Sequence, residues 1–214
     1  MALSDATKKR LAALAVIALI LCIDQALKIW VKTHMCTGES IRMADWAYIA
    51  FIENKGMAFG MSFVGTWLLS LFRLAAIGLL GFALWRIIGR NSGSWGFVLL
   101  LAMVLAGAAG NIIDNVFYGL IFSDSNGLTP ASLVPLGQGC GSLMEGKVVD
   151  MFYFPIIDTN WPQWMPVVGG DHFVFFSPIF NFADAAITTG GILLVVCYYK
   201  TLNRLLARKK TDID

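Results

Sequence analysis

Charged side chains are scarce in this chain of 214 residues, because Asp, Glu, Lys and Arg together make up only 14% of it. A soluble domain of similar size carries about 25% charged residues, and 57% of this chain is hydrophobic. The shortage argues against an ordinary soluble domain and places the chain in a membrane. The net charge of +2 gives no sign of a nucleic-acid partner.

Histidines and cysteines are also few. The only two histidines, His34 and His172, form no HExxH motif, which excludes a zinc protease of that type. No G-x-S-x-G is present, and the four cysteines form no CxxC pair. We therefore expect neither a metal nor another cofactor. Whether Cys36 pairs with Cys140 is left open by the sequence.

Long apolar runs, by contrast, are plentiful. Four of them could cross about 30 Å of hydrocarbon, which takes about 20 residues. We place these spans at about 11–31, 64–88, 96–118 and 178–199. Basic residues lie before the first run, after the second and after the last, so the positive-inside rule predicts that both termini are cytoplasmic. We expect one four-helix membrane domain over residues 1–214, with segments 33–63 and 119–177 outside.

The two outside segments differ in pattern. Alternation in WAYIAFIENKGMAFGM predicts short strands with a turn at Gly56. The second segment opens with SDSNGLTPASLVPLGQGCGS, whose Gly, Ser and Pro content is typical of a mobile loop.

Polar residues within the apolar runs suggest contacts between helices. Asp24 and Lys28 are four residues apart and share a helix face, which predicts an ion pair. Asn111 and Asp114 are three apart and follow a run of small residues, which favours interhelical hydrogen bonds. Arg73, in the second run, is given no role.

Two further acids are candidates for chemistry. Asp150 lies in a segment that starts and ends at the outer membrane face, and Asp184 lies about 6 residues, or roughly 9 Å, inside the last run. Two close carboxylates share a proton, so one can activate water while the other polarises a carbonyl. That is aspartic-protease chemistry, but intramembrane acids also serve proton relays. From these residues alone, a hydrolase and a small transporter are about equally favoured.

Five separated blocks decide between these interpretations. They resemble, in the same order, the blocks of lipoprotein signal peptidase (signal peptidase II), the bacterial membrane aspartic protease family: DQALK at 24–28, ENKGMAFG at 53–60, GNIIDN at 110–115, KVVDMFYF at 147–154 and FNFADAAI at 180–187. The resemblance implies an all-α membrane protein of four transmembrane helices with a small extracytoplasmic β-cradle and an outside loop or short helix. It also implies that Asp150 and Asp184 are the catalytic dyad.

The remaining family positions imply substrate-binding residues, which are Asn54, Gly56, Asn111, Asp114, Asn115, Asn181 and Ala183. The family usually has Arg, a longer cationic donor, at the position of Asn115. The resemblance further implies an endopeptidase of the bacterial inner membrane that cleaves diacylglyceryl-modified prolipoproteins before the lipidated Cys. Its expected partners are these precursors, membrane lipids and the cyclic peptide inhibitor globomycin, and it is expected to be a monomer. The alternatives are a proton-relay transporter, an inactive precursor-binding member of the family and a helix scaffold.

Overall fold

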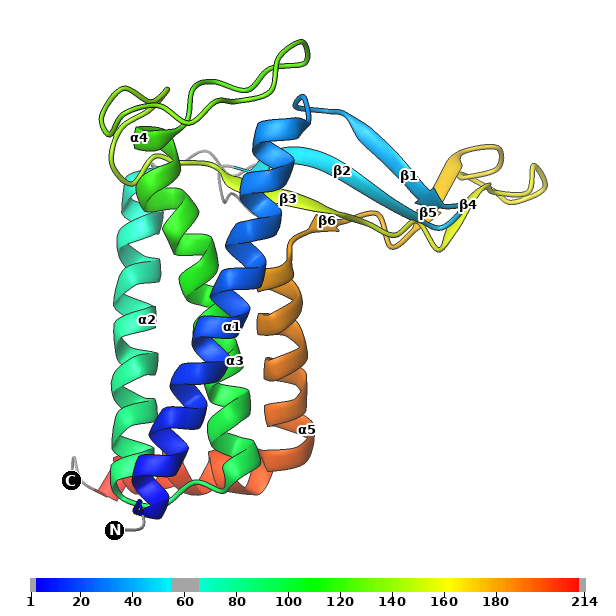
Figure 1. Ribbon diagram of the computed structural model, residues 1–214. Helices are drawn as coiled ribbons and strands as arrows, with labels where there is room; N and C mark the ends of the chain where they lie inside the picture. The colour runs from blue at the N-terminus through cyan, green and yellow to red at the C-terminus, as the bar shows by residue number, and fades with distance from the viewer. Residues whose placement is uncertain (1–2, 55–65, 212–214) are drawn as a thin grey trace.

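The computed structural model describes residues 3–54 and 66–211. Four long helices run side by side as a bundle, and β-structure projects from one end of it (Figure 1). The helices are α1 (Asp5–His34), α2 (Thr66–Gly89), α3 (Trp95–Ile113) and α5 (Phe182–Thr211). All four are long and apolar enough to cross a membrane, as the sequence predicted. Large apolar side chains such as Leu79 and Val196 are exposed along the bundle, where lipid would cover them.

Helix α3 packs against each of the other three long helices. Small residues permit the close approach, because a Cβ added at Gly107 would lie 2.4 Å from the Ala183 carbonyl oxygen of α5. A Cβ at Gly110 would lie 2.7 Å from a carboxylate oxygen of Asp24 on α1. The small-residue run therefore allows α1 and the start of α5 to converge on one stretch of α3.

The C-terminal end of α3 widens into a π-helix, η2 (Asp114–Tyr118), before the short helix α4 (Gly119–Ile121). Single π-turns of this kind are frequent at functional sites. The side chains of Asp114 and Asn115, at the start of this turn, are fully buried. Gly146 packs directly against the turn, since a Cβ there would lie 2.1 Å from the Asp114 carbonyl oxygen.

The segment between α1 and α2 and the segment between α4 and α5 pair with each other in one antiparallel sheet. Its order is β1 (Ser40–Ala44), β2 (Ala47–Asn54), β3 (Val148–Tyr153) and β6 (Ile179–Phe180). A separate hairpin joins β4 (Ile157–Asn160) to β5 (His172–Phe175). The four apolar helices and the small β-structure that were predicted are present, but the class name all-α does not describe a chain with these two sheets. Strand β2 lies within the stretch where alternation predicted short strands, whereas the predicted turn at Gly56 and the rest of that stretch lie outside the described residues.

The Gly-, Ser- and Pro-rich stretch after α4 contains little regular structure. Backbone hydrogen bonds nevertheless tie it back to α4 and the residue after it: Gly137 and Gly139 both donate to the Leu120 carbonyl, and Cys140 donates to that of Phe122. All four cysteines are free thiols, so Cys36 and Cys140 are not joined in this structure.

Helix α5 begins at Phe182, whereas the apolar run predicted a start near 178. The difference arises because Ile179 and Phe180 pair with β3 as strand β6. Asp184 consequently lies in the first turn of the helix. At its other end α5 bends at Tyr198, where φ is −126° and ψ is 19°, and its last part turns across the end of the bundle (Figure 1).

Candidate active site

Asp150 and Asp184 come from different elements and are joined by one asparagine. Asp150 lies within β3 and is 4% exposed. Asn181, directly before α5, donates from Nδ2 to Asp150 Oδ1 at 2.7 Å. Its Oδ1 accepts from the Asp184 backbone N–H at 2.8 Å, and its own N–H donates to Asp184 Oδ2 at 3.3 Å. This reciprocal cap starts the helix and also links the two acids.

A buried lysine fixes the direction of the next hydrogen bonds. Lys28 Nζ can only donate, and it donates to Asn111 Oδ1 at 2.9 Å. Asn181 Nδ2 also donates to that oxygen, at 3.1 Å. The amide nitrogen of Asn111 must therefore point the other way, and it donates to Asp184 Oδ1 at 2.7 Å. Asp184 thus receives a donor whose orientation is set by a cation on α1.

Lys28 itself is fully buried between two carboxylates, at 2.9 Å from Asp24 and 2.8 Å from Asp114. Asp24 also accepts from the Ala183 N–H at 2.9 Å, and Asp114 accepts from the Val149 N–H at 3.3 Å. The pair expected on α1 is therefore part of a larger cluster. It holds α1, the π-turn, the start of α5 and the strand that carries Asp150 in one arrangement.

Gln25, which sequence reasoning missed, extends this cluster. Its Nε2 donates to Asp114 Oδ1 at 2.9 Å, and its Oε1 accepts from the Tyr118 hydroxyl at 3.1 Å. Its position next to Asp24 in the DQALK block was the available signal.

The second oxygen of Asp150 faces a hollow at the sheet. Asn54, at the end of β2, donates from Nδ2 to Asp150 Oδ2 at 3.1 Å. A hollow of about 370 Å³ opens beside this contact and is lined by Ile52, Glu53, Asn54, Asp150, Ser177 and Ile179. Burial raises the pKa of Asp150 to about 6, and the charge of Asp184 acts in the same direction, against the hydrogen bonds from Asn54 and Asn181. Gly56, another candidate, lies outside the described residues.

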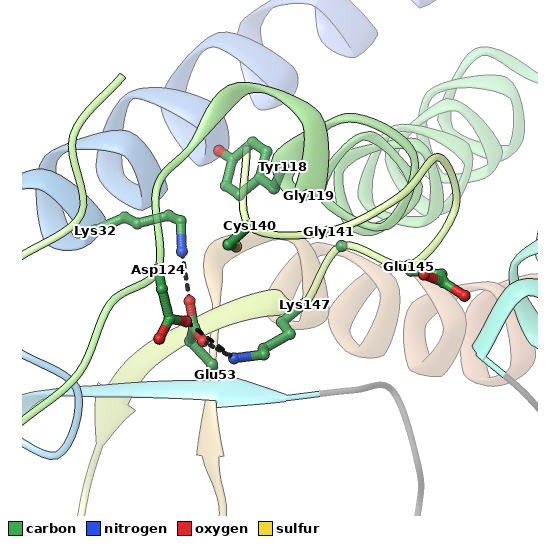
Figure 2. A pocket seen from close by; sticks show the side chains of 10 residues that line it. Lys32, Glu53, Tyr118, Gly119, Asp124, Cys140, Gly141, Glu145 and Lys147 are labelled. Atoms are coloured by element: carbon green, nitrogen blue, oxygen red, sulfur yellow. Dashed lines mark hydrogen bonds and ion pairs between the residues drawn. The ribbon is translucent and has the colours of Figure 1, made fainter. Parts of the chain in front are cut away.

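A second cavity, of about 80 Å³, is also lined by Glu53, and neither dyad acid is among its lining residues. Figure 2 shows the Glu53 carboxylate between two lysines, Lys32 of α1 and Lys147 just before β3. Lys147 Nζ donates to Glu53 Oε2 at 2.5 Å. Burial alone would raise the pKa of Glu53, but the bonds from Lys147 and Lys32 outweigh it and lower the pKa. The cluster anchors β2 and β3 next to Asn54 and Asp150. No spacing in the sequence signalled it.

Metal ligands do not gather at this site. Within residues 3–54 and 66–211 no group of three His, Cys, Asp or Glu side chains is arranged to hold a metal ion. The groups around the two acids are amides and an ammonium, which can donate hydrogen bonds to a carboxylate.

Known proteins are similar in sequence to this chain over most of its length. Residues 16–200 match the family described as signal peptidase (SPase) II. The chain belongs to the signal peptidase II family. It is 48% identical over 197 residues to the lipoprotein signal peptidase of Porphyromonas gingivalis, covering 92% of this chain and 87% of that one. Identity to the lipoprotein signal peptidase of Amoebophilus asiaticus is 32% over 200 residues, covering 89% and 78%.

A solved structure described as a bacterial membrane enzyme supports the same fold. It aligns with a TM-score of 0.56 at 22% identity and covers 90% of each chain. This signal peptidase II family member is therefore a membrane protease built on four apolar helices with small sheets.

Asn115, one of the predicted substrate-binding residues, is fully buried. Its Nδ2 donates to the Gly146 carbonyl at 2.8 Å, and its Oδ1 accepts from Arg73 Nη1 at 2.7 Å. Arg73 comes from α2 and was given no role from the sequence. The sequence could have pointed to Arg73, because a charged residue within an apolar span is by default a candidate functional residue.

Proposed function

We propose that this chain is an aspartic endopeptidase that removes signal peptides from diacylglyceryl-modified prolipoproteins, cleaving on the N-terminal side of the lipidated Cys. The observation that carries the proposal is the asparagine-linked pair of Asp150 and Asp184 beside an open hollow at one end of a membrane bundle. Family membership supports the reaction class, and the names of the relatives support the lipoprotein substrate.

Asp150 is proposed to hold the proton and Asp184 to be ionised. Asp150 is buried in the sheet, and its raised pKa of about 6 keeps it protonated at higher pH than an ordinary Asp. Asp184 lies at the first turn of α5, where the helix dipole favours an anion, and it accepts the lysine-oriented Asn111 amide.

The catalytic step follows from this assignment. The Asp184 carboxylate takes a proton from water as the water oxygen attacks the scissile carbonyl carbon. Asp150 gives its proton to the carbonyl oxygen, forming a neutral tetrahedral diol. Collapse of the diol breaks the C–N bond, the proton held by Asp184 passes to the leaving nitrogen, and a diol proton returns to Asp150. Water is consumed, and no covalent enzyme intermediate forms.

The remaining site residues are proposed to support substrate binding, some by lining the hollow and others by holding the residues that do. Asn54 lines the hollow directly, and Gly56 follows it in the sequence. Asn111 and Asn181 orient the acids, and Asp114 holds Lys28 in place. The substrate role of Ala183 is proposed to depend on its small side chain at the start of α5.

The proposed setting is the bacterial inner membrane, with both termini cytoplasmic and the site at the outer face. Exposed basic residues gather near one end of the long helices, namely Lys8, Arg10, Arg86, Arg90 and Lys200. Asp150, Asp184 and the two sheets lie at the other end. This asymmetry is the one that the positive-inside rule requires. We further propose that the chain acts as a monomer in contact with membrane lipids and binds globomycin-type cyclic peptides.

The proposal is tested by incubating the purified protein, in detergent and in proteoliposomes, with a prolipoprotein that does or does not carry diacylglycerol. Mass spectrometry should find cleavage before the lipidated Cys, and little cleavage of the unlipidated precursor. Asp184→Asn serves as the inactive control. Uncleaved precursor together with proton flux across the proteoliposomes would instead favour a transporter.

A further inference from the structure

Arg73 is placed where a charged side chain is costly. It lies about two turns into α2, inside the stretch Ser70–Gly89 that is apolar enough to cross a membrane. Arginines at such depth pair with protein groups and mark sites that handle substrate or ions. Its Nη1 donates to Asn115, the residue directly after Asp114, whose carboxylate lies 2.8 Å from Lys28 Nζ. Arg73 therefore belongs to the same site as the two acids, although it comes from a different helix.

Asn115 holds this guanidinium in a defined direction. The amide nitrogen of Asn115 donates to the Gly146 carbonyl, so its oxygen must face Arg73 and accept from Nη1. One turn earlier on α2, Ser70 Oγ donates to the Met144 carbonyl at 3.1 Å. Both contacts fix this face of α2 against the chain just before β3. A guanidinium carries five N–H donors in a planar fork, so it can bind more than one acceptor at a time.

The substrate needs donors at this depth. A peptide bound at the membrane interface must have its backbone carbonyls hydrogen-bonded, because lipid supplies no partner. The side-chain amides of Asn54, Asn111 and Asn181 already donate to the two carboxylates. The ammonium of Lys28 is enclosed by Asp24, Asp114 and Asn111. The planar guanidinium of Arg73, held beside Asn115, carries a fork of N–H donors that carbonyl oxygens can accept from.

We propose that Arg73 is a substrate-binding residue whose guanidinium donates to backbone carbonyl oxygens of the precursor next to the scissile bond, with Asn115 as its support. The inference rests on the proposed function and deepens it, because it names the group that holds the peptide backbone. It also gives Asn115 a role in substrate binding that is exerted through Arg73. Arg73 takes no part in proton transfer.

The test compares Arg73→Gln with the parent protein on a lipidated prolipoprotein. Loss of a charge-assisted hydrogen bond to bound substrate should raise KM by roughly 10- to 100-fold and leave kcat nearly unchanged. Arg86→Gln, at the exposed end of the same helix, is the matched control and should leave both constants unchanged. If Arg73→Gln does not fold, Arg73→Lys replaces it; Lys keeps the charge but lacks the planar fork, so KM should still rise.

A double-mutant cycle tests the link to Asn115. Asn115→Ala should raise KM in the parent but add almost nothing in the Arg73→Gln background. An unchanged KM in Arg73→Gln, a fall confined to kcat, or additive effects of the two changes would overturn the inference. Asp184→Asn distinguishes a failure of the proposed peptidase function from a failure of the proposed role of Arg73. If it still cleaves, the proposed function fails; if it is inactive while Arg73→Gln has a normal KM, only the inference about Arg73 fails.

Discussion

Replacing Asp150 by Asn should make the protein more stable at neutral pH relative to acid pH, although it removes activity. Burial in the folded chain raises the pKa of Asp150 to about 6, whereas the ordinary pKa of an Asp is 3.8. The raised pKa means that the parent loses stability as the pH rises from about 4 through about 6. A difference of about two pH units, at 1.36 kcal/mol each, is a loss of about 3 kcal/mol. Asp150→Asn has no such proton to lose.

Thermal unfolding of both proteins in detergent, at about pH 4 and about pH 7.5, measures this difference. For a chain of this size, about 3 kcal/mol corresponds to roughly 6–12 °C in Tm. The gap between variant and parent should therefore widen by that amount at the higher pH. The substitution also has a stability cost that does not change with pH, because the new amide nitrogen faces groups that donate to the Asp150 carboxyl in the parent. This constant cost cancels when the two pH values are compared. Asp171→Asn, at an exposed acid in the same region, should show no widening. A gap that does not change with pH would refute the argument that burial near Asp184 holds the proton on Asp150.

Three further changes test the supports of the site. Lys28→Met leaves two buried carboxylates without their cation, so it should cost about 3–5 kcal/mol of stability; chemical unfolding measures this loss, and a cost under about 1 kcal/mol would contradict the cluster. Glu53→Gln should cost about 1–3 kcal/mol at neutral pH. Because the pKa of Glu53 is lowered from its ordinary value of 4.5, that cost should shrink as the pH falls below that value and Glu53 takes up a proton, and a cost that stays unchanged in acid would argue against the ion cluster. Gly107→Ala should sharply lower the yield of folded protein, because its Cβ would lie 2.4 Å from the Ala183 carbonyl, whereas Gly78→Ala meets nothing within 4 Å and should be neutral; equal yields would contradict the close packing of α3 on α5.

The sequence predicts what depends on local pattern. Apolar runs predicted the four helices because span length is set by the thickness of the hydrocarbon. The start of α5 was placed too early because hydropathy does not distinguish an apolar helix start from an apolar edge strand such as Ile179–Phe180. The pairing of β2 with β3 could not be predicted, since it joins residues about a hundred positions apart, as in Ile52 with Asp150.

The sequence predicted Asp150 and Asp184 as a pair of acids but did not predict the residues that contact and orient them. The motif blocks identify Asp150 and Asp184 and place Asn181 near them. Nothing in the spacing shows that Lys28 orients Asn111, because that contact depends on how α1 packs against α3. The pairing of Arg73 with Asn115 depends in the same way on α2 and the π-turn. Cross-helix contacts of polar side chains are the part that a single sequence leaves undetermined.

The central claim is that Asp150 and Asp184 act as one unit on a bound lipoprotein precursor. The most direct test measures turnover and precursor binding for Asp150→Asn, for Asp184→Asn and for the protein carrying both changes. Groups that act as a unit give non-additive losses. We predict that all three variants lose turnover to the same extent, by about 1,000-fold or more, while still binding the lipidated precursor. Substantial turnover by either single variant, or a further loss in the double variant, would contradict the account.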